Sequence, residues 1–186
     1  MKSYSRTIIN SVFSGSKVSP VLPYMSLQAK HNDTELFEDN AARISISGVQ
    51  EKFSFIQLKN KIRLTIENEQ GTHILKPIPT VLKNADQMPA NEHLTMQIAQ
   101  QVYGIETAAN ALMYFGNGEP AYLTKRFDVL PDGTKLAQED FAALAAKSPQ
   151  THGTNYKYQG SYLDLFLLMR QFIPSYRVES LKLFKL

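Results

Sequence analysis

The chain has 186 residues, of which 43% are apolar and 20% charged, and this composition is typical of a globular protein. It contains no cysteine, which excludes disulfides, thiolate metal sites and thiol nucleophiles, and no apolar run is long enough to predict a membrane span. The formal net charge is +3, with basic residues scattered among acidic ones, so the sequence does not support direct nucleic-acid binding. The four histidines are widely separated, and no metal cluster is expected.

The first 43 residues show no clear period, and we interpret them as an irregular N-terminal segment. Alternating apolar residues then predict a hairpin of two strands over residues 52–58 and 61–67. A third short strand over residues 72–77 ends at Pro77, because proline cannot donate a hydrogen bond to a sheet. A proline-rich loop follows.

A helix is predicted to begin at Asn91, whose side chain suits an N-cap, and to end before Gly104. Leu94, Ile98 and Val102 follow each other at i, i+4 and i+8 and define an apolar face of this helix.

Two further strands are predicted over residues 106–115 and 121–130, and the remaining chain is predicted to be helical. The helical segments are residues 138–147, residues 161–173 and a last helix from about Ser175. The last helix is still apolar at Leu186, and an apolar face needs a partner. Periodicity alone allows either a terminal helix docked on the domain or a larger lobe that continues past Leu186.

This order of elements predicts an α+β fold, with a mainly antiparallel sheet and one packed helix followed by a helical segment. Strands precede the first helix, two strands follow it, and the helices come last.

Four features in this order suggest nucleotide binding. Residues 45–52, with the sequence SISGVQEK, combine small residues with a glycine, and backbone amides in such a turn can point at phosphate oxygens. Lys76 at a strand end and Glu92 on the following helix could form the pair by which kinases hold a lysine against ATP phosphates. Residues 123–129, LTKRFDV, stand where a kinase hinge would run. Each feature alone also fits an ordinary loop or a solvated charge, whereas their order is that of a kinase small lobe.

Several co-linear segments resemble the HipA family of bacterial serine/threonine kinases over residues 43–186. These segments are ISISGVQEKFSF, THILKP, NEHLTMQIAQQVYGIETA, AYLTKRFDV, LAQEDFAAL and NYKYQG. The resemblance implies a protein-kinase-like small lobe over residues 44–129 and the first helices of a large lobe over residues 130–186, with ATP and Mg²⁺ as cosubstrates.

The resemblance also implies a cytoplasmic toxin–antitoxin system. In this family the intact kinase phosphorylates an aminoacyl-tRNA synthetase and blocks translation. A helix-turn-helix antitoxin similar to HipB restrains it, so that contact with DNA is only indirect and no membrane is involved.

The motif Ser45-Ile46-Ser47 is most similar to the short HipT-type kinases of the three-gene systems, HipBST, which have Ser-x-Ser ahead of the glycine. The resemblance implies that Ser45 and Ser47 are autophosphorylation sites. It also implies a small HipS-like protein as a second antitoxin.

Carried over to this sequence, the resemblance implies that Lys76 contacts ATP phosphates, with Glu92 as its candidate partner, and that Lys125 and Phe127 contact adenine at the hinge. The implied nucleotide-binding residues are Ser47, Gly48, Val49, Gln50, Lys76, Lys125, Phe127 and Gln138.

The family's catalytic loop, which resembles GNxDxHxKN, and its later magnesium-binding aspartate have no match in these 186 residues. We therefore assign no catalytic or metal-binding residue in this chain and expect those groups beyond Leu186, in a kinase of which this chain is an inactive part. Two alternatives are a complete, non-catalytic module or split-kinase half that binds antitoxin partners, and an unrelated α+β protein. The sequence does not identify the phosphorylated protein or the oligomeric state.

Overall fold

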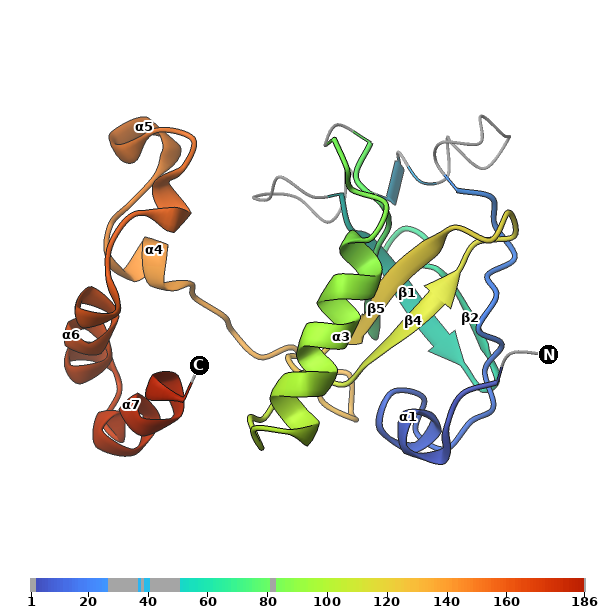
Figure 1. Cartoon of the computed structure of the whole chain (residues 1–186), viewed down its shortest axis with the longest axis horizontal. Coiled ribbons are helices and arrows are strands. Elements are labelled where there is room, and N and C mark those ends of the chain that lie inside the picture. The colour runs from blue at the N-terminus through green and yellow to red at the C-terminus, as the bar shows by residue number, and fades with distance from the viewer. Residues whose placement is uncertain (1–2, 27–36, 38, 41–50, 81–82, 186) are drawn as a thin grey trace. The chain divides into compact units, whose positions relative to one another are not determined.

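The computed structural model describes residues 3–26, 37, 39–40, 51–80 and 83–185 of the chain. The chain divides into two compact units, Met1–Thr134 and Lys135–Leu186 (Figure 1). The first unit contains a sheet and a long helix, and the second contains helices alone.

The first unit is built on a five-stranded antiparallel sheet with the strand order β2-β1-β3-β5-β4. Helix α3 (Met88–Gln101) connects β3 to β4 and packs against β4 and β5 (Figure 1). All five predicted strands are present, and the α+β class is confirmed. The strands are β1 (Phe53–Leu58), β2 (Lys61–Leu64), β3 (His73–Lys76), β4 (Asn110–Tyr114) and β5 (Pro120–Lys125).

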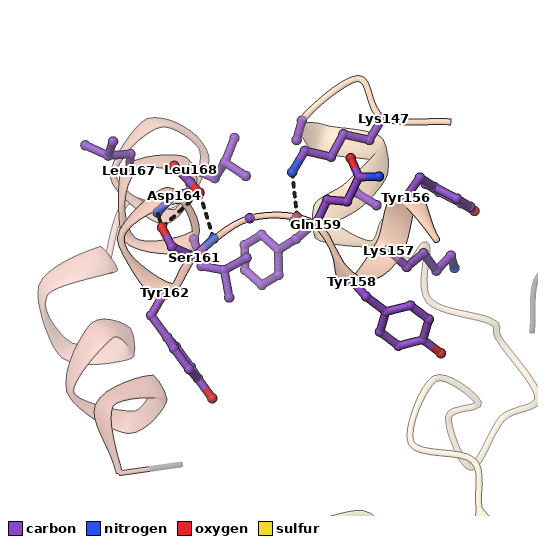
Figure 2. Close-up of a pocket in the computed structure, with 15 residues that line it drawn as sticks. Lys147, Tyr156, Lys157, Tyr158, Gln159, Ser161, Tyr162, Asp164, Leu167 and Leu168 are labelled. Carbon is purple, nitrogen blue, oxygen red and sulfur yellow. Dashed lines mark hydrogen bonds between the residues drawn. The ribbon is translucent and has the colours of Figure 1, made fainter. Parts of the chain in front are cut away.

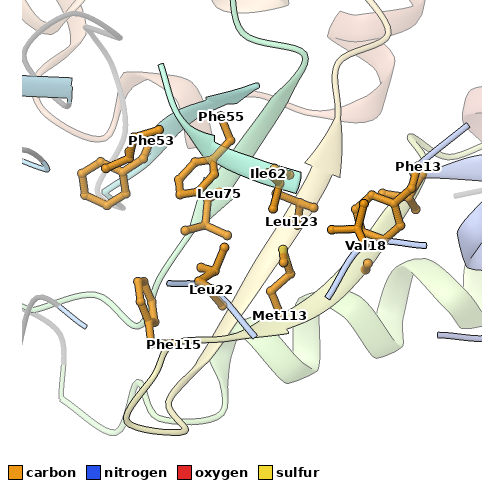
Figure 3. Packing of buried hydrophobic residues seen from close by; sticks show 14 of the residues in the cluster. Phe13, Val18, Leu22, Phe53, Phe55, Ile62, Leu75, Met113, Phe115 and Leu123 are labelled. Carbon is orange, nitrogen blue, oxygen red and sulfur yellow. The ribbon is translucent and has the colours of Figure 1, made fainter. Parts of the chain in front are cut away.

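The apolar core lies on one face of the sheet, against residues from the N-terminal part of the chain (Figure 3). Alternate residues of each strand point to this face, as expected for a sheet with one buried side. The most deeply buried apolar residues of this cluster include Val12, Phe13, Leu22, Phe53, Phe55, Leu75, Met113, Phe115 and Leu123.

The N-terminal segment differs from the irregular structure predicted for residues 1–43. Helix α1 (Arg6–Ser11) begins after Ser5, whose hydroxyl accepts a hydrogen bond from a backbone amide of the first turn. Val12 and Phe13, directly after this helix, are fully buried in the core. The helix is too short for periodicity to reveal, and its contacts come from strands far away in the sequence.

Helix α3 begins earlier than predicted. Asn91 lies inside the helix, where its backbone amide donates a hydrogen bond to the Gln87 carbonyl at 2.8 Å, and Gln87 occupies the N-cap position. Pro89 is accommodated in the first turn because amides there have no partner within the helix. Gly104 follows the helix with a φ of +64°, the left-handed conformation predicted for a residue that ends it.

The apolar face of α3 is turned away from the sheet. Leu94, Ile98 and Val102 are exposed, whereas the half-buried residues of the helix are both polar and apolar. His93 Nδ1 lies 2.8 Å from Asn110 Oδ1, and Gln97 Nε2 donates a hydrogen bond to the same oxygen at 3.1 Å. Side-chain hydrogen bonds therefore contribute to the attachment of the helix to β4.

The second unit contains short helices, and side chains cap the starts of three of those described, α4, α5 and α6. Residues 138–147, predicted as one helix, form only the four-residue α4, whereas the predicted helices over residues 161–173 and from Ser175 are present as α6 and α7. No helix among the described residues is long and apolar enough to cross a membrane. The elements are α4 (Phe141–Leu144), α5 (Pro149–His152), the 3-10 helix η2 (Tyr156–Tyr158), α6 (Tyr162–Phe172) and α7 (Tyr176–Phe184).

Replacing Asn91 by alanine tests where α3 begins. At an N-cap this change costs about 1 kcal/mol of stability, whereas inside a helix alanine is favoured over asparagine by up to about 0.7 kcal/mol. We expect urea unfolding of the Asn91→Ala variant, followed by circular dichroism, to show unchanged or slightly increased stability. A loss of about 1 kcal/mol would instead indicate that Asn91 is the cap.

His73 is a buried histidine on the core face of β3. Its Nε2 lies 3.0 Å from the Val12 carbonyl, which can only accept, so Nε2 carries the proton and Nδ1 accepts from the Thr72 hydroxyl at 2.8 Å. Burial lowers the pKa of His73 to about 4, and the charge of Lys125 acts in the same direction. The neutral imidazole therefore fits this site, and the protonated form does not.

The stability of the first unit should consequently fall in acid. The unfolded chain binds a proton at His73 near pH 6.5 and the folded chain only near pH 4, so the contribution is complete above pH 6.5 and is lost as the pH falls toward 4. From about pH 7 to about pH 5 this one group should remove about 2 kcal/mol of unfolding free energy. Urea unfolding at the two pH values measures the change. The His73→Gln variant should lose clearly less, and an equal loss in both proteins would contradict this role for His73.

Candidate nucleotide-binding site

Lys76 and Glu92 form an ion pair that joins the sheet to α3. Lys76 is the last residue of β3, Glu92 lies in the second turn of α3, and Nζ is 2.6 Å from Oε1. The side chains remain 28% and 27% exposed, so both can be reached from solvent. The structure therefore brings together the two residues that the sequence selected as a lysine and its partner. Their role toward ATP stays a prediction.

Tyr122 is a third member of this cluster that the sequence did not indicate. It pairs with Lys76 in the register of β3 and β5, so both side chains lie on the sheet face that α3 covers. The Lys76 ammonium lies 5.4 Å from the centroid of the Tyr122 ring. Burial and, secondarily, the Glu92 charge raise the pKa of Tyr122 to about 12. Only the pairing of the strands reveals this residue, because β3 and β5 are far apart in the sequence.

The Lys125 side chain lies on the opposite face of the sheet from Lys76. It pairs with His73 in the strand register, and its Nζ donates a hydrogen bond to Ser14 Oγ at 2.9 Å. Its backbone amide donates to the Ala109 carbonyl at 2.8 Å. Contact between adenine and the ammonium would require the bond to Ser14 to break. The ammonium is therefore engaged elsewhere, and the predicted contact of Lys125 with adenine at the hinge stays a prediction.

Phe127 follows β5 and is 73% exposed, so its ring is accessible to a ligand. An ion pair between Arg126 and Asp128 flanks it, in which Arg126 Nε donates to Asp128 Oδ1 at 2.9 Å. Asp128 is buried, and the Arg126 amide donates to the Thr72 carbonyl at 2.9 Å. These neighbours hold the backbone on both sides of Phe127, while its predicted contact with adenine stays a prediction.

The predicted phosphate loop lies outside the described residues. This applies to the proposed nucleotide contacts and to both proposed autophosphorylation sites, which are Ser45, Ser47, Gly48, Val49 and Gln50.

The described residues on either side of this loop are held by hydrogen bonds. Asn40 is buried, accepts a hydrogen bond from the Ser54 amide at 2.8 Å and donates one to the Thr65 carbonyl at 3.0 Å. Glu51 accepts a hydrogen bond from the Thr80 hydroxyl at 2.5 Å. The flanks of the predicted loop are thus tied to the sheet and to the segment that follows Lys76.

Gln138 is exposed and belongs to the second unit. It has no regular secondary structure and does not line the pocket of that unit, so its predicted place near the nucleotide stays a prediction.

The second unit contains a pocket of about 780 Å³ that the sequence did not indicate (Figure 2). Aromatic and aliphatic side chains from α4, η2 and α6 form most of its wall. The lining residues are Phe141, Ala142, Ala145, Lys147, Tyr156, Lys157, Tyr158, Gln159, Gly160, Ser161, Tyr162, Asp164, Leu165, Leu167 and Leu168.

Both lysines of this pocket already have partners within the unit. Lys147 Nζ donates to the Gln159 carbonyl at 2.7 Å (Figure 2), and Lys157 forms an ion pair with Asp140 at 2.7 Å. The pocket therefore presents mainly tyrosine rings and apolar surface.

Among the residues that the structure describes, no group of three or more His, Cys, Asp or Glu side chains could hold a metal ion. The chemistry that these residues can offer is electrostatic: an ammonium held between a carboxylate and an aromatic ring, partly open to solvent. Such a group can bind an anionic phosphate.

Comparison with known proteins identifies the family of the chain. The family model described as HipA-like C-terminal domain matches residues 44–186. A relative from Sinorhizobium fredii (strain NBRC 101917 / NGR234), named "Putative kinase Y4mE", is 26% identical over 147 residues, which are 76% of this chain and 33% of that protein. The chain thus spans about a third of the length of the relative it matches.

A solved structure also matches part of the chain. It is described as "Shewanella oneidensis MR-1 Toxin Antitoxin System HipA, HipB and its operator DNA complex". The match has 26% identity and a TM-score of 0.36, and it covers 51% of this chain and 21% of that one. Because the family model matches most of the sequence, the chain belongs to the HipA-like C-terminal domain family.

Proposed function

We propose that this chain is the ATP-binding part of a HipA-like serine/threonine protein kinase. The observation that carries the proposal is the ion pair between Lys76 and Glu92, which places a partly exposed ammonium at the end of a central strand. Membership of the HipA-like family and the name of the Sinorhizobium relative, a kinase, support it.

The physical role of Lys76 follows from the charge of ATP. Phosphoryl transfer depends on positioning and on charge stabilisation, and a lysine held by a helix carboxylate supplies both for the phosphates. The family's catalytic aspartate has no match in the 186 residues. We therefore expect this chain by itself to bind ATP without transferring its phosphate. Magnesium would accompany ATP, and we assign none of its ligands to the described residues.

We further propose that the intact protein is a HipT-type toxin of the cytoplasm that phosphorylates an aminoacyl-tRNA synthetase. Its antitoxins would be a HipS-like and a HipB-like protein, with DNA bound only through the latter. The motif Ser45-Ile46-Ser47 supports the assignment to this type. The structural relative named above was solved with HipB and operator DNA.

Exposed apolar side chains favour a second candidate function. In each unit several large apolar residues of the helices are exposed, and such surfaces are typical of protein–protein contacts. The chain would then act without catalysis, as a module or half of a split kinase that binds antitoxins or a completing polypeptide. These exposed residues include Leu94, Ile98, Val102, Leu163, Leu167, Val178, Leu181 and Phe184.

Replacing Lys76 by methionine tests nucleotide binding. Methionine keeps most of the length of the side chain and removes the charge, so we expect the affinity for ATP to fall about 10-fold to 100-fold. Isothermal titration calorimetry with ATP and Mg²⁺ measures this on the 186-residue chain. Lys61→Met, at an exposed lysine of β2, is the matched control and should bind as the wild type does.

Equal affinity of the Lys76→Met and Lys61→Met proteins would refute the proposed role of Lys76. A wild-type chain that binds no nucleotide but forms a stable complex with the neighbouring gene products would favour the module. Transfer of phosphate by this chain alone would show that the expected catalytic groups are not required.

Replacing both Ser45 and Ser47 by aspartate tests the predicted phosphate loop. Two added negative charges beside the ATP phosphates should lower the affinity for ATP about tenfold. The double alanine variant, which adds no charge, should bind within about twofold of the wild type, because backbone amides make the predicted phosphate contacts. Calorimetry as above provides the measurement. Unchanged affinity of the aspartate variant would indicate that this segment is an ordinary turn.

A further inference from the structure

The Lys76 ammonium has two neighbours of different kinds, and they come from different elements. Glu92 approaches from α3 and carries a negative charge, whereas Tyr122 lies across from Lys76 on the adjacent strand and carries none. The ring centroid is 5.4 Å from Nζ, within the range at which an aromatic face attracts a cation.

The two contacts differ in what they do to the lysine. The carboxylate at 2.6 Å holds the ammonium in place and also offsets part of the positive charge of the site. An aromatic ring attracts the ammonium through its quadrupole and leaves the net charge of the site positive. Contact with the ring therefore restrains a flexible side chain without lowering its attraction for an anion.

The contacts also differ in how firmly they are anchored. Tyr122 is 1% exposed, and its strand pairs with β3 on one side and with β4 on the other, where Tyr122 is the middle residue of the pairing, so its ring is firmly enclosed. Glu92 depends on the position of α3, which is attached to β4 by exchangeable side-chain hydrogen bonds. Any displacement of α3 would weaken the bond to Glu92 and leave the contact with the ring in place.

We propose that Tyr122 is a positioning residue whose ring holds the Lys76 ammonium on the α3 face of the sheet. The proposal that this ammonium then meets ATP phosphates rests on the proposed function, whereas the hold itself does not. Burial raises the pKa of Tyr122 to about 12, which keeps the phenol uncharged at neutral pH, in agreement with a ring contact instead of a phenolate ion pair.

If the ring holds Lys76 through a cation–π contact, the strength of the contact depends on the electron density of the ring more than on its hydroxyl or its volume. Phenylalanine at position 122 should preserve it, and singly, doubly and triply fluorinated phenylalanine should weaken it stepwise at nearly constant shape. Tyr122→Leu should abolish it. Circular dichroism verifies that each variant is folded, and the fluorinated series remains informative if the leucine variant does not fold.

An activated ester acetylates the Lys76 amine, and mass spectrometry of the full 186-residue chain without nucleotide measures the rate of this reaction. A slower rate at Lys76 indicates that the ring holds the amine. Exposed Lys61 is the internal control. The Lys76 rate should be unchanged in Tyr122→Phe and should rise stepwise with fluorination, by about threefold to tenfold for the most fluorinated ring, because the amine loses one of its two restraints. An equal rate throughout the series would overturn the proposal.

Affinity for ATP in the same variants separates this inference from the proposed function. It should fall by about threefold to tenfold in the order in which labelling rises. If the Lys76 acetylation rate rises with fluorination but the chain binds no ATP, the ring contact is supported and the proposed function is refuted. If ATP binding depends on Lys76 but the Lys76 acetylation rate is the same in all ring variants, the proposed function is supported and the ring contact is refuted.

Discussion

The pairing register of β3 and β5 determines which side chains of these two strands lie opposite each other. His73 is opposite Lys125, and Lys76 is opposite Tyr122. Since neighbouring residues of a strand point to opposite faces, this register directs the first pair to the core and the second pair to α3. A shift of one residue would bury the charge of Lys76 in the core and expose His73 to α3. The many buried aromatic and aliphatic residues on the core face oppose such a shift.

The same register explains why α3 can be attached through polar groups. The face of the sheet beneath it contains Lys76 and Asn110, and these residues are matched by Glu92, His93 and Gln97. A partly exposed ion pair contributes about 1 kcal/mol or less. The position of α3, and with it the bond from Glu92 to Lys76, therefore depends on several modest interactions, while the ring of Tyr122 belongs to the sheet itself.

The core face of the sheet binds the N-terminal residues of the chain. Three neighbouring strands each contribute a polar side chain to the residues directly after α1: Gln57 to the Phe13 carbonyl at 2.9 Å, His73 to Val12, and Lys125 to Ser14. Lys125 thus has a structural partner for its side chain on this face, while its predicted contact with adenine at the hinge stays a prediction.

Local sequence by itself determined the strands, because alternating residues such as Ile62 and Leu64 follow the pleat. It also determined α6, where Ser161 and Asp164 form a capping box, and it selected Lys76 and Glu92 as a pair. It misplaced the start of α3, because Asn91 is a good cap only when no earlier turn forms, and it overlooked α1, whose buried neighbours are distant in the sequence.

The tertiary structure alone decided which faces are covered. Leu94, Ile98 and Val102 satisfy the spacing of a buried helix face, yet polar pairing with the sheet turns them outward. Tyr122 likewise becomes a neighbour of Lys76 only when β5 pairs with β3. Spacing along the chain specifies which residues share a face, but the partner of that face depends on contacts between residues far apart in sequence, which no local pattern contains.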